Sequence, residues 1–143
     1  MFDLDDCFAL ITSRSGKIFA KTLDEQLSSK GMPRTQWIAM YYIHNSEYLT
    51  QKGLADKMSI REPTVARMLQ KMESDGFLVR EGSSKDKRIK YLELTDKGTK
   101  EFLELMPIVE RFKDNTVKGI CEKDLELFKT LLDKMIENTL NME

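Results

Sequence analysis

A short segment near the middle of the chain combines an apolar stripe with long polar and cationic side chains. Val65, Met68, Leu69 and Met72 recur at helical spacing, which places them on the inward side of a helix. On the opposite side, arginine can donate two hydrogen bonds to guanine, threonine can meet thymine, and glutamine can pair with adenine. We therefore predict that this helix contacts duplex DNA. The predicted contact residues are Arg61, Thr64, Arg67, Gln70 and Lys71.

A second cluster of charge follows on a polar loop. Lys85, Asp86, Lys87, Arg88 and Lys90 fall within six residues and carry a net charge of +3. An arginine at a projecting tip can enter a narrow minor groove, where the negative potential is strong. Asp86 is two residues from Arg88, so we expect its carboxylate to accept hydrogen bonds from the guanidinium and hold it extended. We predict DNA contacts at Lys85, Asp86, Lys87 and Arg88.

The helix that carries Arg67 is expected to be the second of a helix-turn-helix pair. Thr50 can cap a short first helix that contains Leu54 and Ala55. Because Ala55 is small, the two helices can cross closely there. Ser59 lies in the turn between them, where such motifs often have glycine, so this turn must tolerate a Cβ atom.

The sequence leaves the start of the second helix open. Ser59 and Glu62 have the spacing of a capping box, which would begin the helix near Ile60. Pro63 is compatible only with the first turn of a helix, which favours a start one or two residues later. We expect the helix to end after Ser74, because the glycine of Asp75-Gly76 favours termination.

The remaining elements follow from two periodicities. Apolar residues three and four apart predict helices, whereas runs rich in β-branched and aromatic residues predict strands. Thr95 is expected to cap the helix that follows the strands, and Pro107 is expected to kink it. The predicted helices cover residues 4–29, residues 35–45, the segment from Thr95 to a turn at Gly119, and a closing segment with Leu125 to Leu140; the predicted strands cover residues 77–80 and 89–94. The predicted fold class is mainly α with a small β-hairpin wing, a winged helix-turn-helix.

Charge is distributed unevenly along the 143 residues. The formal net charge is -1 and 41% of the residues are apolar, which suits one compact domain. Residues 34–98 carry 12 Lys and Arg against 9 Asp and Glu, a net charge of +3. Residues 1–33 and 99–143 have net charges of -1 and -3. A basic centre between acidic ends fits a protein whose central face approaches phosphates.

The composition excludes several other classes. No run approaches the roughly eighteen consecutive apolar residues of a membrane span, and the N-terminus is acidic where a signal peptide would be basic. Cys7 and Cys121 lie far apart and form no Cys/His cluster, so we expect no disulfide and no metal site, in a reducing cytoplasm. With one histidine, His44, and no phosphate-binding glycine motif, we expect neither an enzyme nor a cofactor.

Three runs of sequence carry a family resemblance. They are Leu49-Thr50-x-x-x-Leu54-Ala55, then Thr64-Val65-x-Arg67-x-Leu69-x-x-Met72-Glu73-x-x-Gly76-Phe77-Leu78-x-Arg80, and Asp86-x-Arg88-x-x-x-Leu92-x-Leu94-Thr95-x-x-Gly98. With these motifs, the chain resembles the MarR family of bacterial and archaeal regulators over nearly its whole length. Two positions depart from the family pattern. Gly53 stands where a polar helix former is usual and is expected to weaken its helix somewhat, and Ala66 replaces a common hydroxyl residue.

The resemblance implies a homodimeric transcription regulator, expected to be a repressor, on a pseudo-palindromic operator. It places the helix with Thr64 and Arg67 in the major groove, and Arg88, oriented by Asp86, in the minor groove. It also implies that helices from both ends of the chain intertwine to form the dimer. The predicted domains are a dimerisation region of residues 1–33 and 99–143 and a winged helix-turn-helix domain of residues 34–98.

The resemblance further implies a small aromatic or lipophilic effector that releases the DNA. In the family such a ligand lies between the dimer helices and the DNA-reading domain. Ile11, Trp37, Met40 and Tyr41 could line the site here. Aromatic and methionine side chains at helical spacing are, however, more often ordinary core residues.

Cys7 offers an alternative mode of release. Its position is similar to that of the cysteine oxidised in the peroxide-sensing branch of the family. A helix N-terminus favours the reactive thiolate, whereas the neighbouring Asp5 and Asp6 disfavour it. That branch also uses tyrosines around the cysteine, and the matching positions here hold Ile11 and Trp37. Redox sensing at Cys7 and a buried structural thiol are therefore both retained as hypotheses.

A winged-helix module that binds protein rather than DNA is the remaining alternative. Such a module would leave Arg67 and Arg88 without a role on the two elements expected to face the grooves. Salt-dependent binding to duplex DNA separates the two hypotheses.

Overall fold

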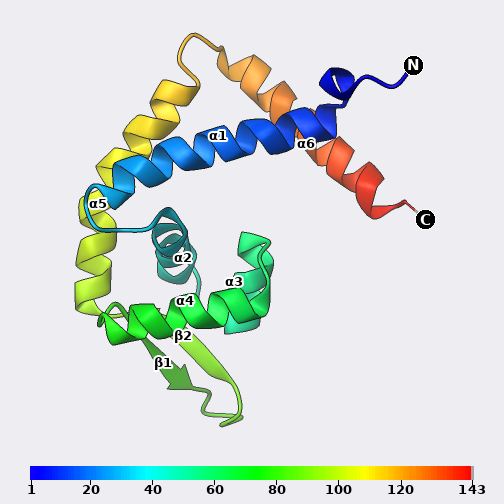
Figure 1. Ribbon diagram of the computed structural model, residues 1–143. Coiled ribbons are helices and arrows are strands. Elements are labelled where there is room, and N and C mark those ends of the chain that lie inside the picture. The colour runs from blue at the N-terminus through cyan, green and yellow to red at the C-terminus, as the bar shows by residue number, and fades with distance from the viewer. Residues whose placement is uncertain (143) are drawn as a thin grey trace. The chain divides into compact units, whose positions relative to one another are not determined.

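The computed structural model of the protein describes residues 1–142 and contains a mainly helical chain with one hairpin (Figure 1). Within these residues there are six α-helices, one 3-10 helix and one two-stranded antiparallel sheet. The elements are η1 (Leu4–Asp6), α1 (Phe8–Ser28), α2 (Arg34–His44), α3 (Gln51–Met58), α4 (Glu62–Ser74), β1 (Leu78–Gly82), β2 (Lys90–Leu94), α5 (Asp96–Thr116) and α6 (Glu122–Leu140). The predicted fold class is confirmed. No helix in this part of the chain is both long and apolar enough to cross a membrane.

The chain divides into two compact units. The central unit, Thr22–Val109, contains α2, α3, α4, the hairpin, the end of α1 and most of α5. The terminal unit combines Met1–Lys21 with the chain from Glu110 onward. Every buried apolar side chain among the described residues lies between Leu23 and Leu105, within the central unit. The hydrophobic core therefore belongs to the central unit alone.

The helix-turn-helix consists of α3 and α4. Thr50 caps α3 as predicted, because its hydroxyl accepts a hydrogen bond from the Gly53 backbone N–H at 3.1 Å. A Cβ atom on Gly53 would lie 3.3 Å from that hydroxyl oxygen and 3.2 Å from Cδ1 of Leu49. The glycine, expected only to weaken the helix, thus leaves room for the cap.

The capping box suggested for Ser59 and Glu62 is not formed. Ser59 adopts the left-handed conformation with φ 54° at the end of α3, which points the chain into the turn. The helix α4 begins later, at Glu62, with Arg61 in the capping position and without a side-chain cap. Pro63 occupies the first turn, where its missing N–H costs nothing.

The helices at the start of the chain differ from the predicted bounds. The expected helix over residues 4–29 is split, because the carboxylate of Asp3 caps η1 and Cys7 then adopts an extended conformation. The second helix begins at Arg34 rather than after Thr35, with Pro33 in the capping position. The Arg34 N–H donates to the carboxylate of Asp24 at 3.0 Å, which satisfies a donor at the start of α2.

The hairpin is joined to α4 and α5 through a compact junction. Leu78 pairs with Leu94 and Gly82 with Lys90, which sets the register of the two strands. At the base of the hairpin, the Thr95 N–H donates to the Phe77 carbonyl at 3.0 Å, and the Thr95 hydroxyl donates to the carbonyl of Gly76 at 2.6 Å. The same hydroxyl accepts from the N–H of Gly98 at 3.0 Å and so caps α5 as predicted.

Gly98 is the position at which this junction has no room for a side chain. A Cβ atom there would clash with the backbone carbonyl of Phe77. We expect Gly98→Ala to lower the free energy of unfolding by about 2 kcal/mol or more, because the atom in the way is backbone and cannot rotate aside. Urea unfolding followed by circular dichroism measures the change.

Gly82→Ala provides the matched control, because no atom lies within 4 Å of a Cβ built on Gly82 of the same hairpin. Equal decreases of stability in the two variants would contradict the close approach at Gly98.

Candidate nucleic-acid interface

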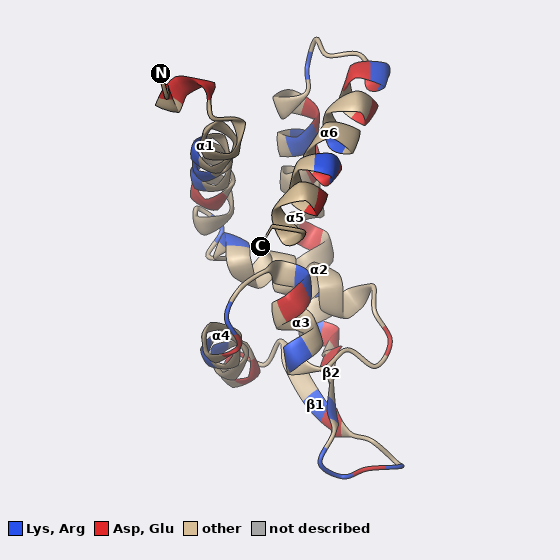
Figure 2. Ribbon diagram, turned by 90° about the vertical axis from the view of Figure 1, so that its right-hand side faces the viewer, with Lys and Arg blue, Asp and Glu red and all other residues tan. Residues whose placement is uncertain are grey.

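The helix α4 separates a buried side from an exposed polar side. Val65, Leu69 and Met72 are buried in the central unit, whereas Met68, also expected to face inward, is half-buried. All the polar residues predicted to face solvent are exposed; these are Arg61, Thr64, Arg67, Gln70 and Lys71. One face of α4 is thus packed, and the other offers hydrogen-bond donors and acceptors along its length. Figure 2 marks the basic residues of α4 and of the hairpin in blue.

The cationic side chains at and along α4 differ in whether they form ion pairs within the protein. Lys71 forms an ion pair with Asp75 one turn later, with Nζ 3.3 Å from Oδ2. Arg61 and Arg67 form no ion pair within the described residues, so their guanidinium groups are available to another molecule. Of the two, Arg67 lies within the helix itself and Arg61 at its start.

At the tip of the hairpin, Arg88 is bonded to its predicted partner, Asp86. The Arg88 Nε and Nη2 atoms donate to Oδ1 and Oδ2 of Asp86 at 3.1 and 3.0 Å, which makes the pair bidentate. The Arg88 backbone N–H also donates to Oδ1 of Asp86 at 3.0 Å. The Arg88 side chain remains 90% exposed. A bidentate carboxylate restricts the guanidinium while leaving it open to solvent.

The turn beneath this pair is formed by Ser83. Its hydroxyl accepts hydrogen bonds from the backbone N–H groups of Lys85 and Asp86 at 3.1 and 3.3 Å. The Ser83 N–H donates to the carbonyl of Ile89 at 2.8 Å across the tip. Lys85 and Lys87 lie exposed beside Arg88, so the tip presents three cations from one short turn.

The pair also changes the titration of both groups. The hydrogen bonds from the Arg88 side chain and then from its backbone hold the pKa of the Asp86 carboxyl below its usual 3.8. In return, the Asp86 carboxylate raises the pKa of the Arg88 guanidinium. Both groups are therefore charged throughout the neutral range.

Arg80 is a structural residue of this surface that the sequence patterns did not reveal. From β1, its Nε donates to Oε1 of Glu73 in α4 at 2.6 Å, and its Nη1 donates to Oε1 of Gln51 in α3 at 2.9 Å. One side chain thus connects the hairpin to both helices of the helix-turn-helix. Arg80 stands at the end of one of the family motifs, but nothing local in the sequence indicates these two partners.

The residues suggested for an effector site fall in both units. Trp37 and Met40 are buried in the central unit; the Trp37 ring stacks on Phe102 at 5.0 Å, and its indole N–H donates to the Phe102 carbonyl at 3.3 Å. Tyr41 is 44% exposed beside Trp37. Ile11 lies in the terminal unit. Effector contact at these residues stays a prediction.

The two cysteines are free thiols. Cys7 is half-buried between η1 and α1, and Cys121 is exposed before α6. Within residues 1–142, no group of three or more His, Cys, Asp or Glu side chains is arranged to hold a metal ion.

Known proteins are similar to this chain in the region that contains α3, α4 and the hairpin. A family model described as MarR family matches residues 30–89, which include α2, α3, α4, β1 and the hairpin tip. YwoH of Bacillus subtilis (strain 168), described as an HTH-type transcriptional regulator, is 26% identical over 125 residues, covering 87% of this chain and 90% of that protein.

Solved structures share the fold along almost the whole chain. The transcriptional regulator PA3341 is 25% identical with a TM-score of 0.85, covering 94% of this chain and 99% of that one. MepR of S. aureus, solved as a DNA complex, is 21% identical with a TM-score of 0.85, covering 96% and 99%. CouR of Rhodococcus jostii RHA1, solved with p-coumaroyl-CoA, is 18% identical with a TM-score of 0.82, covering 94% and 95%.

The Asp86–Arg88 pair predicts a measurable change in side-chain dynamics. We expect Asp86→Asn to lower the ¹⁵N order parameter of Arg88 Nε, because an amide cannot accept both guanidinium hydrogen bonds. In the unmodified chain, that order parameter should stay constant from about pH 8 to pH 5 and fall only below pH 3.8, since the carboxylate persists above its lowered pKa.

The control is Glu81→Gln, which alters a hairpin carboxylate that forms no ion pair in the described part of the chain. An Arg88 side chain equally ordered in Asp86→Asn and in the control would contradict the role assigned to Asp86.

Proposed function

Because the chain belongs to the MarR family of transcription regulators, we propose that it acts as a homodimer that represses transcription from a pseudo-palindromic operator. It is a DNA-binding regulator and not an enzyme, as the family model and the relatives agree. Because the proposed operator lies in chromosomal DNA, we propose the cytoplasm as its compartment.

One observation carries the DNA-binding proposal. The exposed face of α4 and the hairpin tip both present solvent-exposed cations on the same compact unit, and Arg80 hydrogen-bonds from the hairpin to α4. A helix can enter a major groove, and an extended arginine can enter a narrow minor groove. We assign base reading to Thr64, Arg67 and Gln70, and minor-groove contact to Arg88. The remaining proposed contacts, to phosphates or edges, are Arg61, Lys71, Lys85 and Lys87.

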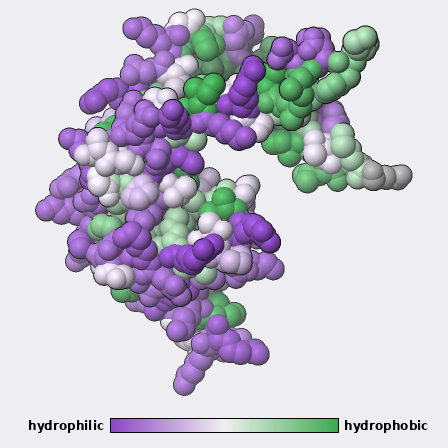
Figure 3. Space-filling model, in the orientation of Figure 1, coloured by the Kyte–Doolittle hydropathy of each residue, from purple (hydrophilic) through white to green (hydrophobic). Residues whose placement is uncertain are grey.

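The proposed homodimer is supported by the terminal unit. None of its described residues is buried, although α6 carries several large apolar side chains. Leu127, Phe128, Leu131 and Ile136 are each more than half exposed. Figure 3 shows hydrophobic residues gathered where the two chain termini lie. A group of large exposed apolar side chains such as this one marks an interaction site. In a homodimer, the same apolar residues of a second copy of the chain would cover it.

Dimerisation through α6 gives a direct test. We expect Phe128→Glu to raise the dimer dissociation constant about 100-fold or more, because an unpaired charge in an apolar interface costs roughly 3 kcal/mol. Sedimentation velocity over a range of protein concentrations measures this constant. Lys129→Glu, at the adjacent exposed residue of α6, is the control and should leave dimerisation unchanged. A Phe128→Glu protein that remains as dimeric as the control would refute the interface.

We further propose that a small aromatic or lipophilic effector releases the operator. CouR, a protein of the same fold, has been solved with p-coumaroyl-CoA. In this chain, Tyr41 is the proposed effector residue with the most exposed ring, whereas Trp37 and Met40 already pack against neighbours. Redox sensing through Cys7 is not favoured, since the structural relatives include ligand-responsive regulators and no observation favours oxidation of that thiol.

The division of labour between α4 and the hairpin predicts two different effects on binding. A duplex selected from a random pool, and a scrambled version of it, are titrated by fluorescence anisotropy at several salt concentrations. Arg67→Ala should cost about 1–3 kcal/mol on the selected duplex and little on the scrambled one. Arg88→Ala should weaken both complexes and reduce the salt slope by about one unit for each phosphate that is no longer neutralised.

Lys123→Ala, at the start of α6, is the control for removal of a positive charge outside the proposed interface. Equal weakening on both duplexes for both variants would overturn the division of labour. DNA binding that does not change with salt would count against the phosphate contacts altogether.

A further inference from the structure

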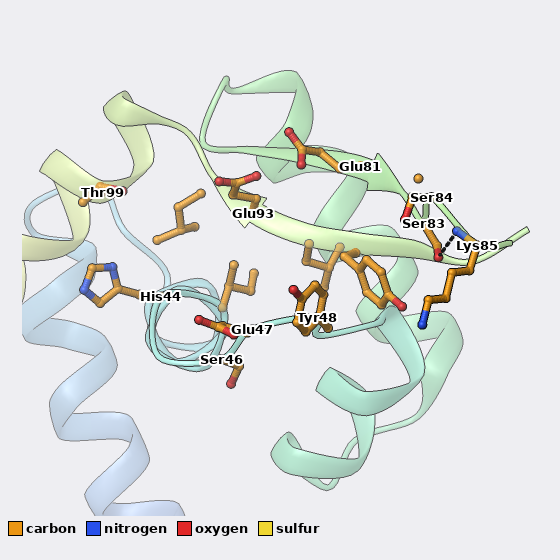
Figure 4. Close-up of a pocket in the computed structure, with 15 residues that line it drawn as sticks. His44, Ser46, Glu47, Tyr48, Glu81, Ser83, Ser84, Lys85, Glu93 and Thr99 are labelled. Atoms are coloured by element: carbon orange, nitrogen blue, oxygen red, sulfur yellow. Dashed lines mark hydrogen bonds between the residues drawn. The ribbon is translucent and has the colours of Figure 1, made fainter. Parts of the chain in front are cut away.

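A cavity beside the hairpin shares only Lys85 with the residues proposed to meet DNA. Its volume is about 910 Å³, and it lies between the hairpin and the segment that includes the end of α2 and the residues after it (Figure 4). All of its lining residues fall between Ile43 and Thr99, within the central unit. We call this cavity the wing pocket. Its volume is in the range of small-molecule sites, roughly 300–1,000 Å³.

Two tyrosines form an aromatic wall of the wing pocket. The rings of Tyr48 and Tyr91 meet edge to face, with centroids 5.2 Å apart and an interplanar angle of 69°. The Tyr48 backbone has a φ of 58°, a conformation that bulky residues rarely adopt, and the residue is 73% exposed. A glycine would relieve the strain, and the exposed ring adds little to the core. The Tyr48 ring therefore occupies a strained backbone position without contributing to the core.

Three carboxylates surround this aromatic wall. Glu81 pairs directly with Tyr91 across the hairpin, and Glu93 follows two residues later on β2, so all three side chains share one face of the sheet. Glu47 comes from the opposite wall, after α2 (Figure 4). None of the three carboxylates forms an ion pair within residues 1–142. Like charges on one sheet face repel one another, and a cation between them removes that repulsion.

We propose that the wing pocket binds a small organic cation with aromatic or apolar substituents. The cation lies among Glu47, Glu81 and Glu93 and against the tyrosine rings, where the quadrupole of a ring face attracts positive charge. The same two rings supply apolar surface for the substituents. A bare metal ion does not fit, because these carboxylates are not arranged as a metal-binding group in the described part of the chain.

The wing pocket reaches the turn that orients Arg88. Ser83 and Lys85 line it, and the hydroxyl of Ser83 accepts the backbone hydrogen bonds of Lys85 and Asp86 that shape this turn. A cation in the pocket repels the ammonium of Lys85 and so disfavours this arrangement. Binding of the cation in the wing pocket is therefore expected to weaken DNA binding. This effect on DNA rests on the proposed function, but binding of the cation itself does not rest on it.

Calorimetric titration of the full chain without DNA tests the site. Tetraphenylphosphonium is the probe, and tetraphenylborate, nearly the same shape with the opposite charge, is its control. We expect the phosphonium to bind and the borate not to bind. The double variant Glu81→Gln/Glu93→Gln should weaken phosphonium binding about tenfold or more, whereas Glu101→Gln/Glu104→Gln, two carboxylates of α5 outside the pocket, should not.

The Tyr48→Gly variant distinguishes an effect on cation binding from an effect on folding. It should abolish phosphonium binding while unfolding at the same or a higher temperature, since glycine accepts the positive φ without strain. Phosphonium binding no tighter than borate binding would overturn the site. Unchanged affinity in both Tyr48→Gly and Glu81→Gln/Glu93→Gln would overturn it as well.

Titration of duplex DNA with saturating phosphonium tests the coupling separately. DNA affinity should fall for the unmodified chain and stay constant for Glu81→Gln/Glu93→Gln. If the cation binds and DNA affinity does not change, the coupling is wrong and the site stands. If the chain binds no DNA at any salt concentration, the proposed function fails, and the calorimetric result on the site is unaffected.

Discussion

At the base of the hairpin, the backbone of α5 approaches the Phe77 carbonyl so closely that only glycine fits at position 98. Three parts of the chain converge there: the end of α4, the base of the hairpin, and the first turn of α5. Thr95 joins all three, because its backbone and hydroxyl together bond Gly76, Phe77 and Gly98. The direction in which the hairpin leaves α4 therefore depends on this junction. Arg80 then fixes the hairpin against α3 and α4 from further along β1.

The two compact units differ in how far they bury their apolar side chains. The central unit buries its apolar residues against one another and can hold α4 and the hairpin in a defined relation. The terminal unit leaves the apolar side chains of α6 at the surface of the single chain. An amphipathic helix gains most of its stability from packing, so α6 is expected to be stabilised by the second copy of the proposed homodimer. DNA reading and dimerisation would then be separate properties of separate parts of the chain.

The hairpin carries two opposite electrostatic surfaces within about a dozen residues. Its tip presents Lys85, Lys87 and Arg88, while one face of its strands presents Glu81 and Glu93 without cationic partners among the described residues. A formal net charge of -1 conceals this separation. The tip is suited to a polyanion and the face to a cation, and Ser83 is shared between the tip turn and the wing pocket. Through this turn, a ligand in the proposed wing pocket would act on the proposed DNA-contacting tip.

Local interactions were predictable from the sequence alone, because they depend on residues a few positions apart. The Thr50 and Thr95 caps, the exposed face of α4 and the bidentate Asp86–Arg88 pair all belong to this class. The capping box at Ser59 was predicted wrongly, since the left-handed conformation that ends α3 competes with it. The bonds of Arg80, the clash that excludes a side chain at Gly98 and the meeting of Tyr48 with Tyr91 join residues far apart in sequence. Only the tertiary structure decides such contacts, because strand register and helix crossing set which distant side chains come within reach.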